Sequence, residues 1–180
     1  MDYSKLVDVY EGLSSTTSLL KKREIIAQFL KDLPTSEIEP SVLLLEGRVF
    51  PEWDQRKIGV GRQLVIKAIS VASGQSETSV KKDWVNIGDL GMVAEKNISS
   101  KTQATLVSSR LTIKHVFDNL KRLAEIGGSG SVSRKVNLIA ELLSSSGGTG
   151  AKYIVRTCLD ALRTGAALGV LRDAIAKAYG

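Results

Sequence analysis

The sequence predicts an all-α fold, a compact domain of about ten helices joined by glycine-rich turns. Apolar residues recur with the helical period in most segments, and an alternation of period two is nowhere sustained. Aromatic residues make up only 5% of the chain and there are three prolines, which argues against a β-sandwich and against a disordered tail. The 180 residues, 43% of them hydrophobic, are enough for one substantial core or for two small cores that share a face.

The first third of the chain is expected to hold amphipathic helices. Residues 2–13 and 19–30 carry apolar side chains at helical spacing, and Pro34 ends the second stripe. Residues 36–40 are interpreted as a loop that leads into a short helix over residues 42–45.

The turn at residues 47–53 carries two large aromatic side chains, Phe50 and Trp53. They could fill a core or present a stacking face. Burial is favoured, because lone aromatic residues in small helical domains are mostly buried.

The middle of the chain is divided by glycines. Gly59–Gly61 precedes an apolar helical stripe that Gly74 ends, and Ser76 is a candidate N-cap for the next short helix. Gly88–Gly91 is predicted to be a tight turn. Asp89 is expected to be a turn or cap residue there, because no second carboxylate accompanies it at metal-ligand spacing.

Residues 97–110 are polar and lack a pattern, so an exposed loop is expected there. This loop would join two sub-halves of about 1–100 and 111–180. Residues 59–72 and 128–143 both run from a glycine turn through a basic residue into an apolar helix. This weak similarity leaves open whether the two segments arose from a duplicated structural unit.

The second half of the chain is expected to contain helices separated by glycine turns. Thr112 is a candidate N-cap for the first helix. The turn Gly127–Gly130 precedes a helix over about 133–143, and the turn Gly147–Gly150 opens the next one. The last helix covers about 170–179.

The charge favours an anionic partner without requiring one. The net charge is +6 and the isoelectric point is about 9.5. Residues 127–180 contribute most of the excess, with seven basic and three acidic side chains. Neither a signal peptide nor an apolar run long enough to span a membrane is evident, so an intracellular location is expected.

The sequence offers no catalytic or metal-binding constellation. The single cysteine, Cys158, and the single histidine, His115, exclude an internal disulfide and a Cys/His zinc site. His115 is interpreted as structural and Cys158 as a packing residue. The glycine turns lack the spacing of an ATP-binding or a dinucleotide-binding loop. An independent small enzyme is therefore the least favoured function.

Three glycine turns support an anion-binding hypothesis. Each is followed by a basic residue in the first turns of the next helix, where the helix dipole disfavours a cation unless an anion compensates. These cations are Arg62, Arg134, Lys135 and Lys152. Free N–H groups near Gly61, Gly130 and Gly150 would attract the same anion. For any single turn the competing interpretation is a glycine that simply ends a helix.

A set of motifs in order along the chain matches a known family. They are Gly47–Trp53, Gly59–Gly61, Gly88–Glu95, Leu162–Gly165 and Gly169–Ile175. On these motifs the sequence resembles the N-terminal DNA-binding domain of archaeal and eukaryotic replicative ATP-dependent DNA ligases. The resemblance implies that residues 1–180 form an all-helical domain with approximate internal two-fold symmetry. It also implies non-sequence-specific binding of nicked duplex DNA through minor-groove phosphate contacts, in replication, repair and recombination.

The resemblance assigns two DNA-contacting segments. Arg163–Gly165 matches one contacting turn and Ser129–Lys135 a second loop, whereas Leu168 stands where many relatives have glutamate. Together with the glycine turns, the predicted DNA-binding residues are Gly61, Arg62, Ser129, Gly130, Ser131, Arg134, Lys135, Gly150, Lys152, Arg163, Thr164 and Gly165.

The same resemblance implies a parent enzyme that forms phosphodiester bonds with ATP and Mg²⁺. The adenylated lysine of the family, in a Lys-x-Asp-Gly motif, does not occur in these residues. The catalytic nucleotidyltransferase and OB domains are therefore expected to be absent. The chain is expected to be inactive alone, to bind no cofactor itself and to be a monomer.

Archaeal relatives often carry a sliding-clamp motif in the loop before the helix of His115. Gln103 and Leu106 fit its start, whereas Ser109 and Arg110 occupy its aromatic positions. The segment is either a degenerate clamp contact or an ordinary solvated loop. The alternative function is accordingly a helical protein-interaction module that docks a sliding clamp or another partner.

Overall fold

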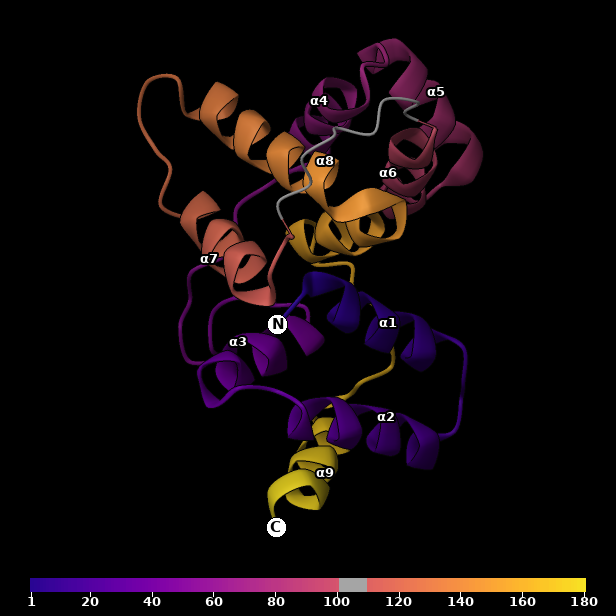
Figure 1. The fold of residues 1–180 in the computed structure, drawn as a ribbon. Helices are drawn as coiled ribbons and strands as arrows, with labels where there is room; N and C mark the ends of the chain where they lie inside the picture. Colours follow the sequence, from indigo (N-terminus) through magenta and orange to yellow (C-terminus); the bar gives the residue numbers. More distant parts are fainter. Residues whose placement is uncertain (101–109) are drawn as a thin grey trace.

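The computed structural model describes residues 1–100 and 110–180, and over these residues it confirms the all-α class (Figure 1). The described part holds nine helices and a single bridge between Asp2 and Thr112. The helices are α1 (Tyr3–Ser14), α2 (Leu19–Lys31), α3 (Thr35–Leu45), α4 (Arg62–Ser73), α5 (Glu77–Ile87), α6 (Leu90–Ser99), α7 (Ile113–Leu123), α8 (Ser131–Cys158) and α9 (Leu168–Tyr179).

A bend in α8 accounts for the difference between these nine helices and the expected number. Gly147 has φ 72° and ψ 174°, so two helical segments meet at this residue. A side chain would disfavour this backbone conformation, and glycine adopts it readily. The turn predicted at Gly147–Gly150 is thus a bend after which the helix resumes at once.

Helices from before and after the predicted boundary pack against each other. α8 packs most extensively against α6 and then α4, and α9 packs against α2. Figure 1 shows α9 at one end of the molecule and α4, α5 and α6 at the other. The described buried apolar residues form one cluster. The internal two-fold repeat and the division into sub-halves stay predictions.

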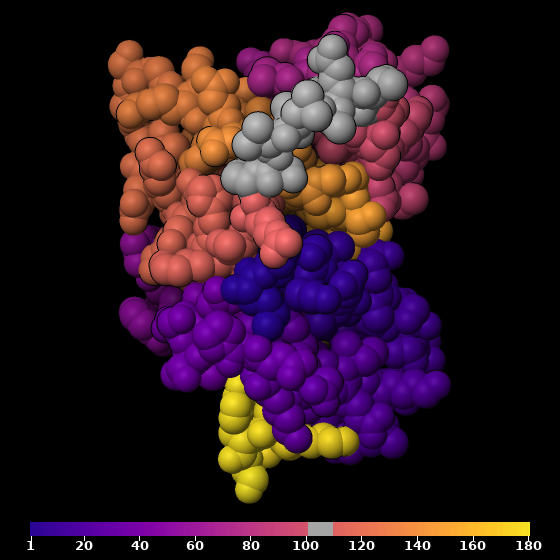
Figure 2. Space-filling model, in the orientation of Figure 1, coloured from indigo at the N-terminus to yellow at the C-terminus, as the bar shows by residue number. Residues whose placement is uncertain are grey.

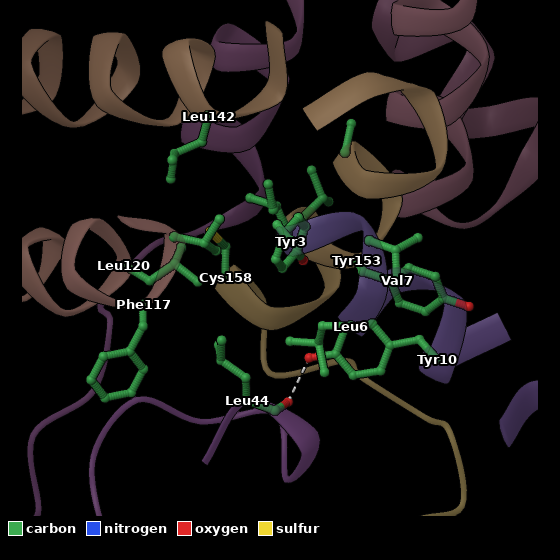
Figure 3. Packing of buried hydrophobic residues seen from close by; sticks show 14 of the residues in the cluster. Tyr3, Leu6, Val7, Tyr10, Leu44, Phe117, Leu120, Leu142, Tyr153 and Cys158 are labelled. Carbon is green, nitrogen blue, oxygen red and sulfur yellow. Dashed lines mark hydrogen bonds between the residues drawn. The ribbon is translucent and has the colours of Figure 1, made fainter. Parts of the chain in front are cut away.

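The core brings together side chains of α1, α3, α7 and α8 (Figure 3). The rings of Tyr10 and Tyr153 lie 4.6 Å apart between centroids. The Tyr10 hydroxyl donates a 2.8 Å hydrogen bond to the carbonyl oxygen of Leu44, which satisfies a fully buried polar group. Cys158 is buried among these residues as predicted, and burial raises the pKa of its thiol to about 12.

Residues 36–40 form helix, and the prediction of a loop there is wrong. α3 begins at Thr35 and continues through Pro40. The φ angle of proline suits a helix, although its missing N–H and its ring disfavour an interior position. Buried Glu37 forms an ion pair with the amino group of Met1. This tertiary contact, together with the apolar packing of α3, outweighs the local signal of the proline.

The prediction of an exposed loop over residues 97–110 is wrong at its start, where residues 97–99 are helical. α6 continues to Ser99, and Asn97 is buried. The amide nitrogen of Asn97 donates to the Asp83 carboxylate at 3.0 Å and to the Val93 carbonyl oxygen at 2.9 Å. A polar residue is buried here because its donors are satisfied, which the sequence pattern alone does not show.

Residues 101–109, and with them the predicted clamp-binding residues Gln103 and Leu106, lie outside the described residues. In the part of the chain that the structure describes, none of the helices combines the length and the apolar character needed to cross a membrane.

Trp53 is exposed, contrary to the prediction that both aromatic residues of its turn are buried. Its exposed fraction is 82%, whereas Phe50 is buried as expected. The Arg56 guanidinium lies 4.4 Å from the centroid of the Phe50 ring and pairs with Asp54. The turn therefore contributes one aromatic side chain to the core. Its irregular backbone gives no period from which the orientation of the other could be inferred.

Gly148 lies at a close approach of α8 to α6, and its substitution tests this packing. A Cβ at Gly148 would lie 1.9 Å from Ser99 Oγ and 2.9 Å from the Glu95 carbonyl oxygen. The serine side chain can rotate, but the backbone oxygen cannot move without shifting α6. We therefore expect Gly148→Ala to lower the free energy of unfolding by roughly 1–3 kcal/mol in urea denaturation.

Gly169→Ala is the matched control for this substitution. Gly169 is exposed in α9, and nothing lies within 4 Å of the position that its Cβ would take. Its replacement should leave the stability unchanged or raise it slightly, because alanine favours helix over glycine. Equal stabilities of the two variants would contradict the close packing of α6 against α8.

Candidate nucleic-acid interface

The first turn of α4 is open to solvent and positively charged. Gly61 occupies the N-cap position, makes no side-chain cap hydrogen bond, and has no atom within 4 Å of the position of a Cβ. Exposed Arg62 is the first helical residue, and the first turn contains no acidic residue. The positive end of the helix dipole is therefore not compensated by α4 itself.

The first turn of α8 has the same features. Gly130 is its N-cap, again without a side-chain cap hydrogen bond. Exposed Arg134 donates to the carbonyl oxygens of Gly127 at 2.7 Å and of Ser129 at 3.2 Å. The arginine thus braces the Gly127–Gly130 turn from the side while its charge stays on the surface.

The side chain of Lys135 links these two helix starts. Lys135 of α8 places its Nζ atom 3.5 Å from the carbonyl oxygen of Gly59, in the turn that leads into α4. The two turns are 76 residues apart in the sequence. Their positive helix ends consequently belong to one surface.

A hollow beside Gly61 extends this surface. It is lined by Val60, Gly61, Arg62, Trp84, Gly88, Asp89, Leu90, Gly91, Arg156, Leu159 and Ala161. The Arg62 guanidinium lies 5.9 Å from the centroid of the Trp84 ring, within the range of a cation–π interaction. The starts of α4 and α6 therefore face the same depression.

Asp89 caps α6 at the edge of this hollow, as predicted. Its carboxylate accepts a hydrogen bond from the Met92 N–H at 2.9 Å and one from Arg156 at 3.1 Å. Burial raises the pKa of Asp89, but these hydrogen bonds outweigh the burial and hold the pKa below its usual range. Asp89 is thus ionised at neutral pH and compensates Arg156.

Arg163 is presented outward by an anchored turn. Leu162 packs against Gly47, where a Cβ would lie 3.0 Å from the Leu162 Cβ. On the other side of Arg163, Thr164 is buried, and its carbonyl oxygen accepts a 2.7 Å hydrogen bond from Lys22. Arg163, between these two anchors, is exposed.

Lys152 has its compensating anions within the protein. Its ammonium lies 2.8 Å from Glu11 and 3.5 Å from Glu95. Gly150 is buried in α8, where a Cβ would lie 2.8 Å from the Ser146 Cβ. An external anion is therefore not needed to explain either residue.

The structure thus groups seven of the predicted residues, whereas Lys152 is paired and Gly150 is buried within the fold. On the joined starts of α4 and α8 lie Gly61, Arg62, Ser129, Gly130, Ser131, Arg134 and Lys135. Arg163, Thr164 and Gly165 lie on the turn that follows Ala161, a residue of the hollow. That any of these residues contacts DNA stays a prediction.

Trp84 and Arg156 at this surface, and Lys22 buried beneath the turn of Arg163, were not among the residues predicted to bind DNA. Trp84 and Arg156 line the hollow, and no local pattern in the sequence places them beside Gly61. Lys22 could have been noticed, because it lies four residues before Ile26 on the apolar stripe of α2, where a cation is unusual.

The fold and this surface define an all-α domain in which uncapped, basic helix starts converge. The family model "DNA ligase N terminus" matches residues 2–176. The chain belongs to this DNA ligase N-terminal family.

Curated relatives agree with this assignment. The DNA ligase of Methanothermobacter thermautotrophicus is 41% identical over 177 residues, which cover 98% of this chain and 32% of the relative. The DNA ligase of Thermococcus fumicolans is 42% identical over 179 residues, and that of Nanoarchaeum equitans 38% over 179 residues. These alignments cover 99% of this chain and 32% and 31% of the two relatives. The chain spans about a third of the length of the curated relatives it matches.

The ion pairs of Lys152 predict a pH-dependent contribution to stability. The hydrogen bond from Lys152, followed by that from Tyr153, holds the pKa of Glu11 below its ordinary value of 4.5. A carboxyl with a lowered pKa in the folded state stabilises above its unfolded pKa, and this contribution is lost as the pH falls through the folded value. Lys152→Gln should therefore lower the free energy of unfolding on the order of 1 kcal/mol at pH 7 and much less at pH 3.

Urea denaturation at the two pH values measures this difference. Lys114→Gln is the control, because Lys114 forms an exposed pair with Asp118 on α7 and its loss should change stability little at either pH. The assignment would be overturned by a Lys152→Gln effect of the same size at pH 3 and pH 7.

Proposed function

We propose that this domain binds nicked duplex DNA through phosphate contacts in the minor groove, as the DNA-binding part of an ATP-dependent DNA ligase. The observation that carries the proposal is the contact between Lys135 and Gly59, which sets two uncapped helix starts side by side. The family of the chain supports DNA as the ligand of this basic surface, because its relatives are DNA ligases.

The groups on this surface suit a phosphate backbone. Backbone N–H groups at a helix start bind anions, and arginine and lysine side chains neutralise phosphates. Arg62 and Arg134 supply such charges at the two helix starts, and exposed Arg163 supplies one on a further turn. Contacts of this kind carry little sequence information, which suits an enzyme that seals nicks regardless of sequence in replication, repair and recombination.

The chemistry of ligation is assigned to the remainder of the parent enzyme. The Lys-x-Asp-Gly motif that would carry the adenylate does not occur in these residues. ATP and Mg²⁺ would be used by the rest of the parent enzyme, which corresponds to about two thirds of the relatives' length. The present domain would hold the DNA. A domain in this role needs a positively charged surface rather than a catalytic group.

Salt dependence tests the proposal directly. If Arg62, Arg134, Lys135 and Arg163 each neutralise one phosphate, log Kd against log salt should have a slope of about 3.6 in magnitude. Fluorescence anisotropy with a labelled nicked duplex, between low and moderate salt, measures this slope. A slope near zero would reject phosphate recognition, and binding to only one of several unrelated duplex sequences would reject sequence independence.

A charge substitution locates the interface. Arg62→Gln should weaken binding to every nicked duplex by roughly tenfold and reduce the slope by about 0.9, because one phosphate contact is lost. Arg172→Gln removes the same charge from α9, which stands out in yellow at the end of the molecule formed by α1 to α3 (Figure 2). Arg172→Gln should leave binding nearly unchanged. Equal losses from both variants would show that net charge, not this surface, governs binding.

A further inference from the structure

Lys22 is a buried cation beneath the turn that carries Arg163. Only 8% of its surface is exposed, and its Nζ donates to the Thr164 carbonyl oxygen at 2.7 Å. Within residues 1–100 and 110–180 the structure shows no ion pair for Lys22. A buried ammonium without a carboxylate is costly, so a structural role alone would more readily be filled by a neutral side chain.

The hydrogen bond from Lys22 fixes the direction of one peptide group. The Thr164 carbonyl and the Gly165 N–H belong to the same planar peptide, in which the two groups point in opposite directions when the bond is trans. Because Lys22 holds the carbonyl inward, the Gly165 N–H is directed outward. Donation by an ammonium also polarises the peptide and makes its N–H a stronger donor.

Gly165 fits this arrangement in two ways. Its φ of 68° lies in the region that glycine adopts readily and other residues rarely do. A Cβ on Gly165 would lie 2.2 Å from Lys22 Nζ, so the ammonium occupies the space of the missing side chain. The close approach of the ammonium to the turn therefore requires glycine at this position.

We propose that Lys22 is a positioning residue for DNA binding, which orients the Gly165 N–H toward a phosphate from beneath the turn. The inference rests on the proposed function and adds a residue to it. Lys22 would act through the peptide and through its uncompensated charge, without lying on the surface itself. Arg163 and the Gly165 N–H would then hold the same stretch of backbone from two sides.

The test compares two lysines on one helix. Lys22→Met removes the donor and the charge while it keeps the length of the aliphatic stem, and Lys21→Met removes the same charge from the exposed neighbouring position. Anisotropy with a nicked duplex at several salt concentrations gives Kd and its salt slope, and thermal denaturation gives the stability of each free protein. We expect Lys22→Met to weaken binding about tenfold more than Lys21→Met, and Lys22→Arg to restore most of the loss.

Each outcome decides for or against the inference. If the wild-type protein binds with the expected salt slope but folded Lys22→Met binds as tightly as Lys21→Met, Lys22 is merely structural and the inference fails while the proposed function stands. If the wild-type protein does not bind nicked DNA, the proposed function itself fails.

Amide resonances of the wild-type protein keep the test open should Lys22→Met fail to fold. On titration with the nicked duplex, the Gly165 amide proton should shift downfield as it donates to phosphate, whereas that of exposed Gly169 should move little. An unperturbed Gly165 amide in the presence of saturating DNA would overturn the inference.

Discussion

The close approach of α8 to α6 is the constraint on which the candidate interface depends. Gly148 of α8 and Gly91 of α6 have no room for a side chain, since a Cβ on Gly91 would lie 2.9 Å from the Lys152 carbonyl oxygen. The bend at Gly147 lets α8 make this contact and still reach the core with Tyr153. Because the two backbones meet here, Arg156 reaches Asp89, and the starts of α4 and α6 share one hollow.

The position of the compensating anion distinguishes the cations of this domain. Lys152 and Arg156 pair with carboxylates of the protein, so their charges serve the fold. Arg62 lies over an aromatic ring, and Lys22 donates to a carbonyl oxygen. Within the described residues, neither Arg62 nor Lys22 forms an ion pair, so no carboxylate compensates their positive charges. A cation near a helix start is thus informative about a ligand only after its partners in the folded protein are known.

Under the proposed function, this domain would hold the DNA for chemistry performed by another part of the enzyme. Backbone N–H groups and basic side chains lie at the starts of α4 and α8. The described residues hold no group of three or more side chains suited to a metal ion. Backbone donors on braced turns have fixed directions, which favours a regular ligand such as a phosphate chain. The chain covers about a third of the length of the DNA ligases that it matches.

The sequence by itself determined the helical class, most helix starts and the buried faces, because capping and apolar periodicity are local. Thr112, Ser76 and Asp89 cap helices as predicted, and Cys158 is buried. Only the tertiary structure decided what each cation faces and which irregular segments pack. It placed Trp53 in solvent, paired Lys152 with Glu11, and joined turns far apart in the sequence through Lys135. The last two outcomes depend on contacts between residues distant in the chain, which neither helical period nor local propensity encodes.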